Sequence, residues 1–117
     1  MAHEPLASCI RPHRKKTSLS QTELARIIGY AKEDPVFQHE QATSVPPFLV
    51  ALAYEATFGV PVSQLFPGFY QVVKQSVDTR IAELEAVLQQ KSGRGRDAKA
   101  TAQKLEWIVA RRSGFKS

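Results

Sequence analysis

The sequence predicts an all-α protein, with five short helices in residues 1–68 and a helical extension in residues 69–117. Apolar residues recur at intervals of three and four, and proline and glycine stand where helices would begin and end. No segment shows the alternating pattern of a half-buried strand. The 117 residues, 43% of them hydrophobic, suffice for one domain with a core and an appended segment.

The first expected helix covers residues 5–16, in which Leu6 and Ile10 fall on one face. Pro12 lies inside this segment and has no backbone N–H to donate. Its ring also clashes with the preceding turn, so the helix either kinks at Pro12 or begins there.

The second expected helix has the clearest boundaries. It opens with a capping box from Ser20 to Glu23, in which the serine hydroxyl and the glutamate carboxylate each accept the other residue's backbone N–H. Gly29 is expected to end the helix in the left-handed conformation, which glycine adopts without steric cost. The helix is therefore about eight residues long.

The third expected helix starts at Asp34 as its N-cap, with Pro35 at the first helical position. Val36 and His39 are three residues apart and are expected to face the core together. A neutral turn, residues 41–44, follows this helix.

The fourth and fifth expected helices complete the domain. The fourth opens at the pair Pro46 and Pro47 and ends at Gly59, again a capping glycine. It runs through four apolar residues at helical spacing: Leu49, Leu52, Ala53 and Ala56. The fifth helix is short and runs from Pro61 to Phe66.

The extension, residues 69–117, carries two narrow apolar seams. The first lies on a long charged helix and contains Val73, Val77, Ile81, Leu84 and Leu88. The second lies on a final helix and contains Ala98, Ala102, Leu105 and Val109. A glycine-containing hinge at residues 91–97 separates the helices. Because neither seam is long enough to be stable alone, the two either pair as a hairpin or bind a second subunit, and we expect a homodimer.

Charge is unevenly distributed along the chain, whose net charge is +5. Residues 1–30 carry five basic and two acidic residues, and residues 71–117 carry ten basic and five acidic ones. Residues 31–70, between them, carry four acidic residues and one lysine. The basic balance indicates either a polyanionic partner such as nucleic acid or ordinary solvated charge.

Several kinds of function find no support in the residues. The single cysteine, Cys9, excludes an internal disulfide and the usual zinc-finger spacings and fits a reducing cytoplasm. Residues 1–8 show no secretory signal, and no stretch is long and apolar enough to span a membrane. The three histidines lack metal-ligand spacing, and no nucleophile is matched with a base. We expect a cytoplasmic protein without catalytic activity, metal or cofactor, and the sequence identifies no small-molecule effector.

Two segments resemble one known family. The first reads LSQTELARIIG and ends at Gly29, and the second reads GVPVSQLF and starts at Gly59. Ala25 is small where two helices would cross closely, and Gly29 stands in the turn between them. Over roughly residues 6–67 the chain resembles the lambda-repressor-like, Cro/cI-type (XRE) helix-turn-helix family of transcriptional regulators.

The resemblance implies that the protein binds double-stranded DNA as a dimer. In that family the third helix enters the major groove, the second crosses the backbone, and two copies lie one helical turn apart. Nine residues are thereby expected at the DNA: Arg14, Lys15, Ser20, Gln21, Lys32, Glu33, Phe37, Gln38 and Gln41. Arg14 and Lys15 would flank the duplex backbone or face solvent. Gln21 would reach a phosphate or support a residue of the third helix, and backbone N–H groups near Ser20 would hold a phosphate.

The third helix departs from the family pattern at its start. Glu33 and Asp34 stand where polar or basic residues are common, and the following turn has no basic residue. Phosphates repel carboxylates, although Glu33 can accept from cytosine and Gln38 can pair with adenine. If Asp34 caps its own helix, Glu33 alone strongly opposes DNA. The alternative is a degenerate helix-turn-helix that serves as a protein-protein interaction module through an acidic third helix.

Overall fold

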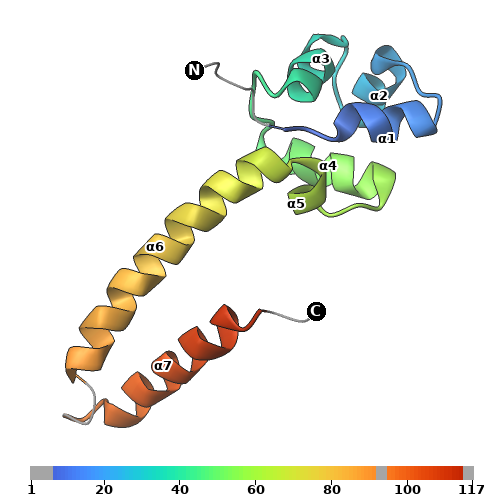
Figure 1. Ribbon diagram of the computed structural model, residues 1–117. Coiled ribbons are helices and arrows are strands. Elements are labelled where there is room, and N and C mark those ends of the chain that lie inside the picture. The colour runs from blue at the N-terminus through green and yellow to red at the C-terminus, as the bar shows by residue number, and fades with distance from the viewer. Residues whose placement is uncertain (1–6, 92–94, 115–117) are drawn as a thin grey trace. The chain divides into compact units, whose positions relative to one another are not determined.

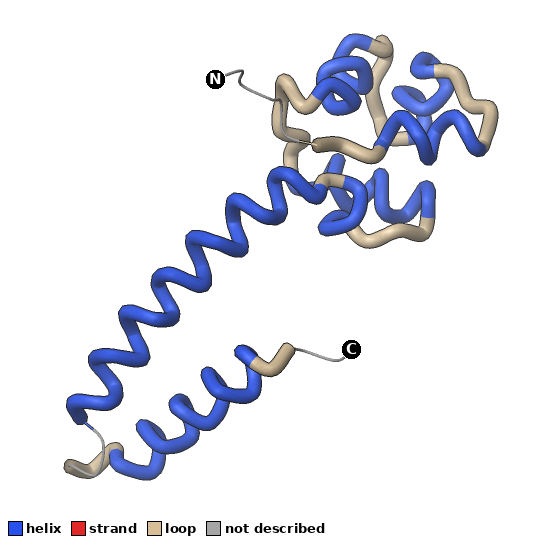
Figure 2. The backbone as a smooth tube through the Cα atoms, viewed as in Figure 1, coloured by secondary structure: helices blue, strands red, loops and turns tan. Residues whose placement is uncertain are grey.

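The computed structural model describes residues 7–91 and 95–114, and these residues form seven α-helices and no strand (Figures 1 and 2). In chain order the helices are α1 (Ile10–Lys16), α2 (Gln21–Ile27), α3 (Asp34–Gln41), α4 (Phe48–Phe58), α5 (Val62–Leu65), α6 (Pro67–Lys91) and α7 (Ala98–Arg112). The expected all-α class is confirmed. The chain divides into two compact units, Met1–Val72 and Val73–Ser117, and the boundary falls inside α6.

The first unit is built around one apolar core. Its buried residues come from α1 to α5 and from the turns beside these helices: Ile10, Leu24, Ala25, Ile28, Val36, Tyr54, Leu65 and Phe66. The Tyr54 ring meets the rings of His39 and Phe66 edge to face, at centroid distances of 5.7 and 5.8 Å. These aromatic contacts place the inner side of α3 against α4.

Two backbone hydrogen bonds join the ends of the first unit. The Cys9 N–H donates to the Leu65 carbonyl over 2.7 Å, and the Gly68 N–H donates to the Ala7 carbonyl over 3.3 Å. The segment before α1 therefore runs beside the segment that connects α5 with α6.

α1 is shorter than expected and begins at Ile10, two residues before Pro12. The first four N–H groups of an α-helix have no partner within the helix, so a proline in the first turn removes no helical hydrogen bond. Pro12 thus lies in the first turn of α1, which begins two residues before the start that the second expected outcome gives. Leu6 lies outside the described residues.

The capping box of α2 is present in full, as expected. The Glu23 N–H donates to Ser20 Oγ over 3.0 Å, and the Ser20 N–H donates to Glu23 Oε1 over 2.9 Å. The Ser20 backbone N–H and, after it, the Ser20 side chain stabilise the charged carboxylate and lower the pKa of Glu23. Gly29 follows the helix with a φ of 103°, so the expected positive φ at this end is confirmed.

α3 begins one residue earlier than expected. The Phe37 N–H donates to the Glu33 carbonyl over 3.0 Å, so Glu33 is the N-cap and Asp34 is the first residue of the helix. No side chain caps this end, and the expected capping role of Asp34 is wrong. The expected inward positions of Val36 and His39 are confirmed, since both side chains are buried.

The side of α4 that faces the core does not follow the spacing of the apolar residues named from the sequence. Leu49 and Leu52 are exposed, Leu49 to 75%, whereas Ala51 and Tyr54 are buried. The helix is apolar on nearly every side, so the spacing of apolar residues could not indicate which side faces the core. Gly59 has a left-handed φ of 67°, which confirms the expected end of α4.

The short fifth helix is present as α5 and ends just before Phe66. Glu55 of α4 accepts the Val62 N–H on its Oε1 over 3.0 Å and thereby satisfies a free donor at the start of α5. Phe66 has a φ of −128° and a ψ of 64°, which interrupts the helical chain. α6 then begins at Pro67, a residue that fits the first helical position.

In the second unit, α7 lies alongside α6 and runs back along it (Figure 1). Where the structure describes this hairpin, three side chains are buried: Leu88 of α6, and Thr101 and Ile108 of α7. The expected seam of the last helix does not form the side of α7 that faces α6, because Val109 is exposed while its neighbour Ile108 is buried. The inward side of α7 instead carries Thr101, Leu105, Ile108 and Arg112, at the same spacing in a different register.

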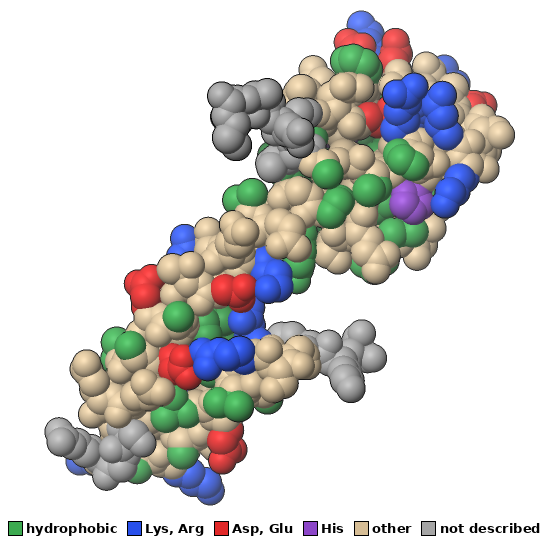
Figure 3. Space-filling view, viewed as in Figure 1, with side chains coloured by type: hydrophobic (Ala, Val, Ile, Leu, Met, Phe, Trp, Pro, Cys, Tyr) green, Lys and Arg blue, Asp and Glu red, His purple; other side chains and the backbone are tan. Residues whose placement is uncertain are grey.

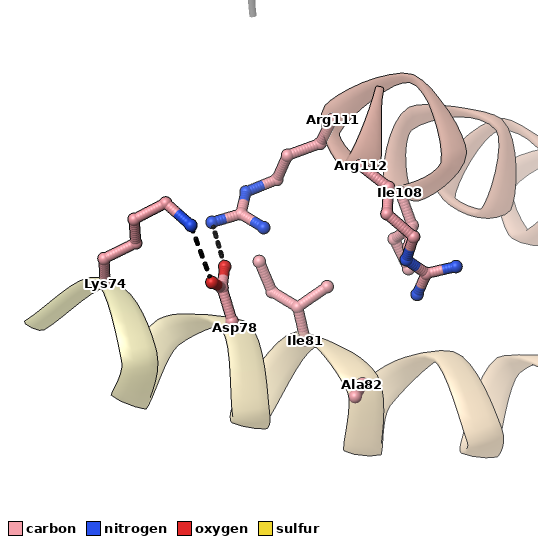
Figure 4. A pocket seen from close by; sticks show the side chains of 7 residues that line it. All are labelled: Lys74, Asp78, Ile81, Ala82, Ile108, Arg111 and Arg112. Carbon is pink, nitrogen blue, oxygen red and sulfur yellow. Dashed lines mark hydrogen bonds and ion pairs between the residues drawn. The ribbon is translucent and has the colours of Figure 1, made fainter. Parts of the chain in front are cut away.

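Ion pairs on the hairpin surround a hollow of about 300 Å³ (Figure 4). Lys74 and Arg111 both bind Asp78, at 2.9 and 2.8 Å, and their hydrogen bonds, that from Lys74 first, lower the pKa of the Asp78 carboxyl. Arg112 binds Glu85 and lowers the pKa of that carboxyl. Each cation that lines the hollow therefore already has a carboxylate partner.

Replacement of the capping serine tests how far α2 depends on its start. We expect Ser20→Ala to lower the free energy of unfolding by about 1 kcal/mol, because the Glu23 N–H loses its acceptor. Denaturant-induced unfolding followed by circular dichroism measures the difference. Thr22→Ala is the matched control, since Thr22 is exposed on the same helix, and should change the free energy by less than about 0.5 kcal/mol. Equal losses in both variants would contradict the stabilising role of the box.

Candidate functional site

α3 has one side fixed in the core and one side free. Val36 and His39 point inward, whereas Phe37, Gln38 and Gln41 are exposed. Positions three and four apart on a helix lie one above the other, so these exposed residues form one face. Phe37 leaves 52% of its surface in contact with water, although its ring is large and apolar. The outer face of α3 (Phe37, Gln38 and Gln41) thus combines two amides with an aromatic ring and is the candidate surface.

One buried carboxylate joins α3 to α1 and α2. Arg14 of α1 donates from Nε to Glu40 Oε2 over 2.5 Å and from Nη2 to Oε1 over 3.3 Å. Gln21 of α2 donates from Nε2 to Glu40 Oε1 over 3.0 Å, and Arg14 Nη1 donates to the Leu19 carbonyl over 3.0 Å. The Glu40 side chain is 1% exposed, and a carboxylate buried so deeply needs such partners. This Glu40 network (Arg14, Leu19, Gln21 and Glu40) holds three helices in a fixed relation.

A histidine joins α3 to α4. His39 Nδ1 and the Tyr54 hydroxyl lie 2.8 Å apart inside the core and share a hydrogen bond. Burial lowers the pKa of His39 and raises the pKa of Tyr54. Both groups are therefore neutral near pH 7, and the pair fixes α3 to a third neighbouring helix.

The nine residues expected at DNA fall into two sets. Seven lie on the surface: Lys15, Ser20, Lys32, Glu33, Phe37, Gln38 and Gln41. Arg14 differs from the expectation, because its guanidinium is bound to Glu40 inside the domain and does not face solvent or a phosphate. Gln21 takes the second of its two expected roles and supports a residue of α3.

The acidic character of residues 31–70 is weaker at the surface than the sequence suggests. Glu40 is paired in the interior, and Glu55 accepts an N–H at the start of α5. The two other acidic residues of this segment, Glu33 and Asp34, remain exposed. Both lie at the start of α3, so the negative field is confined to one end of the candidate surface.

Exposed basic side chains lie on α1, on α2 and in the turn before α3. They are Arg11, Lys15, Lys16, Arg26 and Lys32. Figure 3 shows Lys and Arg side chains gathered over the region of α1 and α2. Positive charge therefore lies on the two helices that precede α3, where it can attract a polyanion.

Glu40 is the residue whose role the sequence pattern did not reveal. It follows His39 directly and lies four residues after Val36, so it falls on the inward side of α3. That position could have indicated a buried carboxylate and hence a basic partner. It could not have indicated which of the basic residues supplies the partner, because Arg14 is 26 residues away.

In residues 7–91 and 95–114, no three or more His, Cys, Asp or Glu side chains are grouped so that they could hold a metal ion. Across the same ranges, no helix combines the length and the apolar character needed to cross a membrane. Compared with known proteins, the chain matches no family model, no curated protein and no solved structure. The function is therefore inferred from the residues of the candidate surface themselves.

Removing one member of the Glu40 network should lower the stability of the fold strongly. We expect Arg14→Met to lower the free energy of unfolding by about 3 kcal/mol or more, because Glu40 would stay buried without its countercharge. The double variant Arg14→Met, Glu40→Leu should lose less than the sum of the two single variants. Urea unfolding of the three variants measures both effects. Arg11→Met removes an exposed arginine from the same helix and should cost less than about 0.5 kcal/mol, so similar losses for Arg11 and Arg14 would refute this account.

The pairing of His39 with Tyr54 should make the fold sensitive to acid. Because burial holds the pKa of His39 below its unfolded value of about 6.5, the unfolded chain binds more protons as the pH falls. Above about pH 6.5 we expect His39 to have no effect on the free energy of unfolding. Below that pH the free energy of unfolding should fall, by at most about 1.4 kcal/mol per pH unit. Unfolding curves at a series of pH values measure this slope. His39→Phe should flatten it, and an unchanged slope in His39→Phe would speak against the mechanism.

Proposed function

We propose that this chain is a sequence-specific DNA-binding transcriptional regulator that acts in the cytoplasm as a dimer. In this proposal α1 to α5 form a five-helix, lambda-repressor-like domain, and α2 and α3 are its helix-turn-helix. The observation that carries the proposal is the way in which α3 is held. Hydrogen bonds join it to three neighbouring helices, while its outer face stays exposed. The motif around Gly29, with its full capping box, supports the same function.

The residues of the outer face suit the edges of base pairs. Side-chain amides such as those of Gln38 and Gln41 can pair with adenine through two hydrogen bonds. An apolar ring such as that of Phe37 can contact the methyl group of thymine, and Glu33 can accept from the amino group of cytosine. Because hydrogen-bond readout needs side chains held in place, a helix fixed by buried contacts is well suited to it.

Affinity would come from basic residues on α1 and in the turn before α3. Lys15 and Lys32 are exposed and can bind phosphates, whereas Glu33 and Asp34 oppose them at one end of the surface. Each phosphate contact contributes a slope of about 0.9 in the logarithm of affinity against the logarithm of salt. With so few contacts, a single domain would bind weakly at physiological salt. Two linked domains would raise the affinity through effective concentration, which is why a dimer belongs to the proposal.

A second candidate function is a protein-protein interaction module. Two observations favour it: Glu33 and Asp34 make no ion pair within the described residues, and Phe37, Phe48 and Leu49 are exposed apolar side chains. In this reading the first unit keeps the helix-turn-helix architecture, and its acidic and apolar surface binds another protein. The two functions differ in their response to DNA.

Fluorescence anisotropy of labelled random-sequence duplex DNA, titrated at low and at physiological salt, tests the proposal. We expect binding at low salt, weaker binding at physiological salt, and a several-fold gain in affinity for Glu33→Gln, because a carboxylate is removed from the phosphate field. Gln38→Ala should lower the affinity for duplexes selected from the random pool by at least about fivefold, since one bidentate contact is worth ~1–3 kcal/mol.

Glu106→Gln is the matched control, because it removes the same charge from an exposed site on α7. Its gain in affinity at physiological salt should be smaller than that of Glu33→Gln, because Glu106 lies outside the proposed helix-turn-helix. A folded protein that fails to bind DNA at low salt would overturn the proposal and favour the interaction module.

A further inference from the structure

α6 carries a stripe of residues that its hairpin partner does not cover. Within the second unit these residues are Val73, Val77, Arg80, Leu84, Val87 and Lys91, separated alternately by four and three positions. This alternation is the heptad spacing of the seam of a coiled coil. Val73 is 58% exposed, Leu84 44% and Val87 48%, so most of its apolar members are in contact with water. We name this stripe the outer seam.

The outer seam differs from the side of α6 that faces α7. α7 binds α6 through Asp78 and Glu85, and Leu88 is buried on the same side. At about 100° per residue, the centre of this side lies roughly a quarter turn around the helix from the outer seam. Pairing with α7 therefore leaves the outer seam free for another helix.

We propose that the outer seam binds the outer seam of a second copy of this chain, in an antiparallel coiled coil that joins two hairpins into a four-helix dimer. Among the described residues of the hairpin three side chains are buried, Leu88, Thr101 and Ile108, which is little for an independent core. A heptad seam is buried only against a partner with a matching repeat, and a second copy supplies that match by symmetry.

The charges on α6 determine the antiparallel direction. In a parallel, in-register pair the two Arg80 guanidinium groups would meet in the same layer and repel. In an antiparallel pair centred between Arg80 and Leu84, Val77 lies opposite Val87 of the second copy. Arg80 then lies beside Glu83 of the second copy, and neither residue has an ion-pair partner within the described part of its own chain. Each copy thus offers the charge that the other needs at the centre of the seam.

This inference rests on the dimer of the proposed function, for which it supplies the surface, but it does not depend on binding to DNA. Size-exclusion chromatography with light scattering and analytical ultracentrifugation, both on the full chain, test it. We expect a dimer, and at least a tenfold rise in its dissociation constant for Leu84→Glu. Ala86→Glu, which adds the same charge to an exposed site on another side of α6, should leave the constant unchanged. A monomeric chain, or equal effects of the two variants, would overturn the inference.

A charge exchange tests the direction. Arg80→Glu alone and Glu83→Arg alone should each weaken the dimer several-fold, because like charges then meet across the axis. The double variant Arg80→Glu, Glu83→Arg should recover most of the affinity. Circular dichroism checks that each variant keeps its helices, and both residues are exposed, so the hairpin has no need of them. A double variant that binds no better than the single ones would refute the antiparallel register.

Cysteine cross-linking gives a second test of the direction in a Cys9→Ser background. Val77→Cys and Val87→Cys proteins, mixed and oxidised, should form a mixed disulfide dimer, because these positions face each other in the antiparallel pair. Val77→Cys alone should cross-link poorly, since its two copies would lie about 15 Å apart along the axis. Efficient cross-linking of Val77→Cys alone would establish a parallel pair and refute the inference.

The DNA titration tests DNA binding, whereas the measurements above test the dimer, so the two results are independent. A monomer that binds DNA would overturn the seam and leave DNA binding supported. A dimer that is broken by Leu84→Glu but binds no DNA would support the seam and overturn DNA binding.

Discussion

The position of α3 depends on the buried carboxylate of Glu40. A charge inside a protein is tolerated only when its hydrogen-bonding and electrostatic needs are met, and here Arg14 and Gln21 meet them from two other helices. If any of the three helices moved, this charge would be left without a partner in a poorly solvated place. α1, α2 and α3 are therefore fixed as a set, and the geometry of the outer face follows from a contact on the opposite side of the same helix.

The same contact between Glu40 and Arg14 alters which charges of the chain reach the surface of the folded domain. By position in the sequence, residues 31–70 form an acidic segment beside a basic one. In the folded domain, Glu40 and Arg14 cancel each other in the interior and are removed from the surface that a partner meets. The remaining acidic pair at the start of α3 is local. A polyanion approaching α1 and α2 would encounter mainly lysine and arginine, which supports the proposal that the partner is nucleic acid.

The sequence predicted those elements whose signals lie within a few residues of one another. The capping box at Ser20 and the end of α4 at Gly59 depend on local backbone geometry, so both could be recognised directly. The side of α4 that faces the core could not, because a helix apolar all round is oriented by its neighbours, here through Tyr54 and His39. The register of α7 likewise depends on its contacts with α6.

The candidate site shows the same division between local and distant signals. The exposure of Phe37 and of the two amides beside it follows from helical spacing, which local sequence encodes. The inward direction of Arg14 follows from Glu40, a partner far along the chain. The local sequence therefore predicts that Arg14 faces the duplex backbone or solvent, and the structure shows it inside the domain. Side chains with long reach and strong charge are thus the least predictable members of a surface, because distant residues decide where they point.

The two backbone bonds between the ends of the first unit, at Ala7 with Gly68 and at Cys9 with Leu65, make that unit a closed ring of chain. Closing a ring of this length costs conformational entropy, which is offset only when the elements between the ends are already in place. Loosening of residues 7–9 and loosening of the α5–α6 connection are consequently coupled, since each segment is the other's hydrogen-bonding partner. A disturbance in one of these two segments is thereby transmitted to the other without passing through the core.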